Sequence, residues 1–143
     1  MASPILIKTE EAVAALATSA SIAAGYNPGT DVFVYRGINN EDVQAPAIIC
    51  EALDGPEDFP FSGIYHASVN LNVKEMAADV SGSVGTLADN IFKAFLVSNV
   101  ESLLTGIVSN YYVYQLLVKD TNNGTSGDAR SQTYSFDIVC GLT

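Results

Sequence analysis

The sequence is poor in the residues that build reactive or cross-linked sites. Its 143 residues include two cysteines, one histidine and no tryptophan. Cys50 and Cys140 lie far apart, each in an apolar run, and no Cys-x-x-Cys or Cys/His cluster is present to form a zinc or redox motif. We therefore expect two reduced, buried thiols that pack as small hydrophobic side chains, and we expect no metal or other cofactor.

Basic residues and long apolar runs are also scarce. Six Lys and Arg residues stand against sixteen Asp and Glu, giving a formal net charge of −10. Such a charge repels duplex phosphates and anionic lipids, which argues against a nucleic-acid or membrane-surface protein. No apolar run reaches the roughly 18 residues that a bilayer span needs, and the alanine-rich stretch 12–24 lacks the basic flank of a signal peptide. We expect a single domain over residues 1–143, made in the cytoplasm, without a membrane partner.

Hydrophobic residues make up 48% of the chain, which suits one buried core. Helical spacing predicts a first helix that is N-capped by Thr9, runs to Ala24 and stops at Gly25. A second helix is predicted from Thr86 to Leu96, and 99–104 forms either its last turn or a short separate helix. The small apolar residues of the first helix favour close packing against a sheet or against another copy of the chain.

Five segments have the composition or alternation of strands. They are 31–36, 47–53, 65–74, 111–119 and 132–142, and a polar tip over 120–130 joins the last two. The order α-β-β-β-α-β-β predicts an α+β domain, in which an antiparallel or mixed sheet of about five strands packs with two main helices.

The strand 65–74 alternates strictly between apolar and polar side chains, so one face lies on the core and the other faces water or a polar neighbour. Aspartate at Val69 or Leu71 is expected to prevent folding, whereas aspartate at Asn70 or Asn72 is expected to leave it intact. The polar face and the polar tip supply our candidate interface residues for subunits or partners: His66, Ser68, Asn70, Asn72, Lys74, Asn123, Asp128 and Arg130.

Three patterns resemble catalytic or ligand sites without completing one. A Ser-His-Asp arrangement would combine His66 with Ser68 or Ser135 and with Asp137, but the sequence of a nucleophile elbow is absent. The segment 82–86 enters a helix yet lacks the lysine of a phosphate loop. The polar stretch 120–124 departs from a calcium loop in its glycine and in its last ligand. We expect a protein that is not an enzyme.

The assembled order resembles the tail terminator, or tail completion, proteins of long-tailed bacteriophages. The resemblance rests on the alanine-rich first helix, Val34-Tyr35-Arg36, Pro46–Cys50, the alternating Val69–Val73, a second helix bearing Leu87, Ile91, Phe95 and Leu96, and the last strand Ser131–Cys140. It implies a virion protein that forms a ring, usually of six copies, at the junction of head and tail. The implied partners are further copies, the tail tube protein and the neck proteins, and DNA passes through the ring without specific binding.

Two other hypotheses stay open at this point. The chain is alternatively another ring-forming neck or tail component, such as a head-completion or tube-like subunit. A third reading is a small cytosolic enzyme or ligand-binding module that uses His66 or a loop acid near residues 82–86.

Overall fold

The computed structural model describes residues 4–27, 29–30, 32–37, 46–54, 63–76, 86–126 and 129–142. Within these ranges three helices and five strands follow one another, and the strands form one mixed sheet, so the predicted α+β fold class is confirmed. The elements are α1 (Pro4–Ala23), β1 (Phe33–Arg36), β2 (Ala47–Asp54), β3 (Ile64–Met76), α2 (Thr86–Ala94), α3 (Val100–Thr105), β4 (Tyr111–Ser126) and β5 (Ala129–Leu142).

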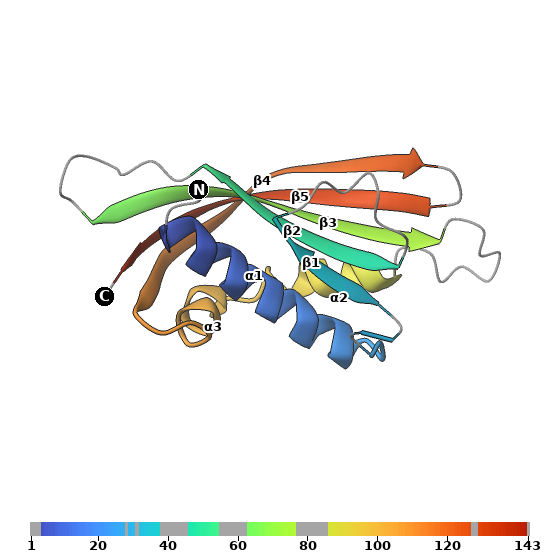
Figure 1. Ribbon diagram of the computed structural model, residues 1–143, viewed down its shortest axis with the longest axis horizontal. Coiled ribbons are helices and arrows are strands. Elements are labelled where there is room, and N and C mark those ends of the chain that lie inside the picture. Colours follow the sequence, from blue (N-terminus) through green and yellow to red (C-terminus); the bar gives the residue numbers. More distant parts are fainter. Residues whose placement is uncertain are drawn as a thin grey trace.

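The strands lie in the order β1-β2-β3-β5-β4, so β1 and β4 form the two edges of the sheet. β1 pairs with β2 in parallel, and every other neighbouring pair is antiparallel. The three helices lie on the same side of this twisted sheet, below it in Figure 1. The sheet therefore has an inner face, which carries the helices, and an outer face on the other side.

The inner face holds the core, and the alternation predicted for β3 is confirmed there. Ala67, Val69, Leu71 and Val73 are each at most 1% exposed. The aromatic rings of α2 stack on those of β5: the ring centroids of Phe92 and Tyr134 lie 4.2 Å apart, and those of Phe95 and Phe136 lie 5.0 Å apart. Apolar spacing in the sequence thus identified the sides of β3, α2 and β5 that pack inward.

The first helix begins earlier than predicted, so the assignment of Thr9 as its N-cap is wrong. α1 starts at Pro4, a position where proline is favoured because the first helical N–H groups need no intrahelical acceptor. Thr9 lies a turn further on, fully buried, and its hydroxyl donates to the carbonyl of Ile5 over 2.7 Å. The predicted end is confirmed, since Gly25 follows the helix with φ +95°.

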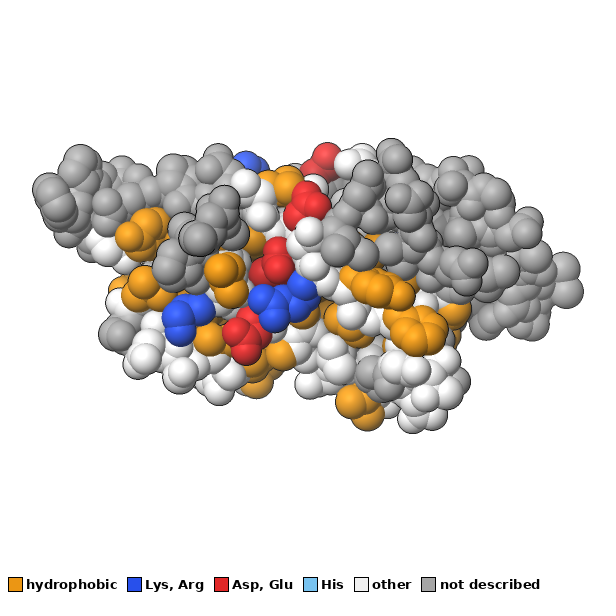
Figure 2. Space-filling view, in the orientation of Figure 1, with side chains coloured by type: hydrophobic (Ala, Val, Ile, Leu, Met, Phe, Trp, Pro, Cys, Tyr) orange, Lys and Arg blue, Asp and Glu red, His pale blue; other side chains and the backbone are white. Residues whose placement is uncertain are grey.

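Two glutamates hold helices against the sheet. On α1, Glu10 Oε2 accepts a hydrogen bond from the Ala52 N–H over 3.1 Å, and Glu10 Oε1 lies 3.4 Å from Arg36 Nε. β1 ends at Arg36 and therefore does not supply an acceptor for the Ala52 N–H of β2. The Glu10 carboxylate is the acceptor instead. On β3, Glu75 Oε1 accepts from the Leu87 N–H over 3.0 Å, at the N-terminus of α2. Basic and acidic side chains adjoin one another around α1 in Figure 2.

The last two strands extend much further than predicted. The segment 120–130 was expected to be a polar loop, but β4 continues to Ser126 and β5 begins at Ala129, so most of it is a two-stranded ladder. Asn123-Gly124 lies within β4 and not in the turn. Residues 99–104 correspond to a separate short helix, α3. In the described part of the chain, no helix has the length and hydropathy of a membrane span.

Candidate functional site

The outer face of the sheet carries a row of polar side chains from β3 and β5. Ser135 Oγ donates to Asn70 Oδ1 over 2.9 Å, and His66 Nδ1 lies 3.9 Å from Asp137 Oδ2. Ser68 stands opposite Asp137 in the register. The side chains of His66 and Asp137 remain 39% and 22% exposed. The sequence therefore placed His66, Ser68 and Asn70 correctly on a polar, accessible face.

The same row becomes buried toward the other end of β3, which the sequence did not predict. Asn72 is 4% exposed and Lys74 is 6% exposed, and their neighbours across β2, Ile49 and Ala47, are buried as well. Asn72 Nδ2 donates to Thr133 Oγ1 over 2.6 Å, while its Oδ1 is buried without a hydrogen-bond partner. Asn72 and Lys74 are therefore not part of the accessible surface of one copy.

The other three candidate interface residues belong to the far end of the β4–β5 hairpin. Asn123 lies on β4 opposite Gln132, and Arg130 lies on β5 between Glu75 and Thr125. Their side chains fall outside the described residues, and so does Asp128 as a whole. The backbone places Asn123 and Arg130 on paired strands, where we had expected a loop.

Exposed apolar side chains gather on β4, which sequence reasoning did not propose as a site. Tyr112 and Tyr114 are 45% and 53% exposed, and their ring centroids lie 4.8 Å apart. Leu117 is also exposed and stands opposite Asp137 on the outer face, whereas the exposed Val118 stands opposite Phe136 on the inner face. We call Tyr112, Tyr114 and Leu117 the β4 patch. The signal in the sequence was a strand-forming run, Tyr111–Lys119, that is apolar at consecutive positions and not at alternate ones.

A glycine near the end of β5 lets its backbone lie close to that of Gly63. Gly141 is opposite Tyr112, and a Cβ placed on it would meet the carbonyl oxygen of Gly63 at 2.7 Å and the ring of Tyr114 at 3.5 Å. A side chain at this position would therefore displace the backbone at Gly63, just before β3, whereas its approach to the Tyr114 ring is an ordinary contact.

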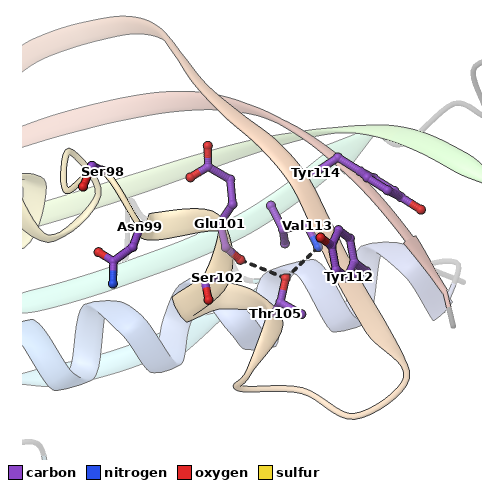
Figure 3. Close-up of a pocket in the computed structure, with 8 residues that line it drawn as sticks. All are labelled: Ser98, Asn99, Glu101, Ser102, Thr105, Tyr112, Val113 and Tyr114. Atoms are coloured by element: carbon purple, nitrogen blue, oxygen red, sulfur yellow. Dashed lines mark hydrogen bonds between the residues drawn. The ribbon is translucent and has the colours of Figure 1, made fainter.

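An open pocket of about 380 Å³ lies between α3 and the start of β4. In Figure 3 the Thr105 hydroxyl accepts from the Val113 N–H over 3.0 Å and donates to the Glu101 carbonyl over 2.8 Å. The Tyr112 and Tyr114 rings form one wall. The full lining is Ser98, Asn99, Glu101, Ser102, Thr105, Tyr112, Val113 and Tyr114.

Both cysteines are free and buried, as predicted. Burial, more than the nearby Glu10 carboxylate, raises the pKa of the Cys50 thiol to about 12. Cys140 Sγ lies 3.6 Å from the Thr9 hydroxyl, which also accepts a hydrogen bond from the Tyr111 hydroxyl over 2.9 Å. Burial raises the pKa of Cys140 and of Tyr111 as well. All three groups stay protonated near neutral pH. Cys140 and Tyr111 form a buried polar contact with Thr9, between α1 and the sheet.

The structure also bears on the three patterns that resembled reactive sites. The Ser135 hydroxyl donates to Asn70, although His66 does lie near Asp137. Asp120 is on β4, where its carboxylate accepts from the Thr121 N–H over 2.8 Å. Residues 82–85 lie outside the described part. Within the ranges that the structure describes, no three His, Cys, Asp or Glu side chains are grouped so that they could hold a metal ion.

The fold, but no sequence family, links the chain to a known protein. No protein-family model matches, and no curated protein matches. Among solved structures, the chain is similar to a chain of the virion of a native gene transfer agent particle, with a TM-score of 0.55 and 13% sequence identity. The similarity covers 97% of this chain and 99% of the other. At that identity the comparison shows a common fold over the full length of both chains.

Proposed function

We propose that the chain is a structural protein of a phage-like virion, and that it forms the ring that ends the tail tube and joins the tail to the neck. The observation that supports this most strongly is the fold similarity to a virion chain over 97% of the sequence. The resemblance of element order to tail terminator proteins, found from the sequence alone, points to the same class of particle.

The surface is suited to such a role. The outer face combines a polar row around Asn70 with the aromatic side chains of the β4 patch, a mixture that is typical of protein interfaces. In this proposal the partners are further copies of the chain, most simply six in a ring, together with the tail tube and neck proteins. The protein acts by shape and contact, without catalysis or a cofactor.

Deletion of the gene from the particle that encodes it tests the proposal. We expect intact, DNA-filled heads and separate tails of irregular length, because tube growth is no longer stopped. Electron microscopy of the particles measures both features, and supply of the wild-type gene in trans should restore joined particles of normal tail length. Deletion that leaves normal joined particles would contradict the proposal, and heads that leak their DNA beside normal tails would favour a head-completion protein.

A further inference from the structure

Among the strands that the structure describes, β4 has a neighbour on one side only, so its outer side is a long strand edge. β4 ends the strand order of the sheet, and the Thr105 hydroxyl accepts the outward N–H of Val113 only at its beginning. Beyond this point Tyr114 and Leu117 are 53% and 46% exposed. Edge strands that stay unpaired usually carry charge or proline, because an apolar edge is a template for another chain. From Tyr111 to Val118 β4 carries neither.

The charge distribution indicates what this edge receives. None of the sixteen acidic residues falls between Ser102 and Lys119, although the chain as a whole carries a net charge of −10. Two copies of such a chain repel one another over most of their surfaces. They approach most easily along a strand edge that carries no acid of its own and exposes apolar side chains, and β4 from Tyr111 to Lys119 is such an edge. The acid nearest to it across the ladder, Asp137, lies on β5 behind Leu117 and not on the edge strand.

The opposite edge of the same sheet offers a matching strand. β1 exposes Phe33, which is 44% accessible. When the strand pairings are followed across the sheet, β1 and β4 run in opposite directions. A second copy added in the same orientation would therefore bring its β1 antiparallel to β4. Such a contact joins two different surfaces, and contacts of this type build rings or filaments instead of closed dimers.

We propose that the outer edge of β4 binds the β1 edge of a second copy of this chain, so that the sheet continues from one subunit to the next. This inference rests on the proposed function, since it assigns the surface through which the ring forms. It names Tyr114 and Leu117 on one copy and Phe33 on the other as the side chains that meet in the contact.

Charge placed on each edge tests the assignment in sedimentation experiments. Wild-type protein should form oligomers as its concentration is raised, whereas Leu117→Asp and Phe33→Asp should each remain monomeric. Leu142→Asp is the matched control, because Leu142 has the same 46% exposure as Leu117 but lies on β5. This variant should assemble like the wild type. Circular dichroism must show that all three variants are folded.

Mixing the two edge variants gives the decisive result. The Leu117→Asp copy keeps an intact β1, and the Phe33→Asp copy keeps an intact β4, so an equimolar mixture should form one-to-one dimers and nothing larger. A mixture that stays monomeric, a wild type that is monomeric at every concentration, or a Leu142→Asp variant that also fails to assemble would overturn the assignment. The proposed function would not fall with it, because that is judged by the gene deletion.

Discussion

Burial of a single thiol makes the folded state sensitive to alkali. Cys50 is fully buried on β2, and burial raises the pKa of its thiol from 9.0 to about 12. Above pH 9 the unfolded chain loses this proton while the folded chain keeps it, so the unfolded state binds fewer protons and stability falls as pH rises. Below pH 9 both states are protonated and the contribution of Cys50 is constant.

We therefore expect the free energy of unfolding to fall by about 1 kcal/mol per pH unit between pH 9 and 12 on account of Cys50. Urea titrations at several pH values measure this slope. Tyr134, whose pKa burial also raises to about 12, adds to it. A Cys50→Ala variant is less stable throughout but should show a shallower slope. An unchanged slope in the variant would mean that Cys50 does not contribute.

Neighbouring residues of β3 should respond in opposite ways to the same substitution. Leu71→Asp places a charge in the core and should unfold the protein, a cost of more than about 4 kcal/mol. Asn70→Asp keeps the acceptor for Ser135 on the outer face and should cost less than about 1 kcal/mol. Far-UV circular dichroism with urea titration separates the two. If Asn70→Asp unfolds the chain and Leu71→Asp does not, the two faces of β3 are reversed.

Asn72 marks the limit of the prediction made from alternation alone. The sequence indicates that aspartate is tolerated at Asn70 and Asn72 alike, whereas the structure buries Asn72 and leaves its Oδ1 without a partner. A carboxylate there would be a buried charge, so we now expect Asn72→Asp to destabilise the protein by about 3 kcal/mol or more. The same urea titration measures it, and stability equal to that of Asn70→Asp would contradict this revision.

At the scale of elements, α1 is fixed to the sheet through one carboxylate. Glu10 accepts from Ala52 and faces Arg36, while the adjacent Glu11 is exposed. Glu10→Ala should cost about 1–2 kcal/mol, mainly because the Ala52 N–H loses its acceptor. The partly exposed pair with Arg36 adds little. Glu11→Ala, the matched control, should change the urea midpoint hardly at all. Equal effects at the two positions would show that the contact with β2 is not stabilising.

The elements that the sequence predicted are those whose pattern is set by the core. Apolar residues recur at regular spacing in β3, in α2 and on one face of β5. The faces predicted from this spacing are the ones that pack inward. The start of α1 and the tip of the hairpin were missed, because polar residues such as Thr9 and Asn123 suit caps and turns equally well. Tertiary contacts decide their conformation: Thr9 bonds within the core, and Asn123 pairs with β5.

The candidate site could also be predicted only in part, because tertiary contacts decide which side chains stay exposed. Alternation identifies which side chains of β3 leave the core, and it placed Asn70 correctly. It cannot show which part of the outer face other segments cover, nor that β4 ends the strand order. The β4 patch follows from that order, because in a central strand Tyr114 and Leu117 would have a neighbouring strand on both sides and would not lie at an open edge.

At the scale of the whole molecule, net charge decides how the protein meets DNA. With sixteen acidic and six basic residues, the chain should repel a duplex, which suits the proposed ring, whose channel would let DNA pass without adhering. We expect no change in the fluorescence anisotropy of a labelled duplex at low salt, for the monomer and for assembled rings alike. Binding to DNA that is strong at low salt and lost at high salt would reveal phosphate contacts from a basic surface, and it would contradict the passive channel. Because low salt strengthens any attraction between protein and phosphate, a negative result under that condition is the most demanding test of this prediction.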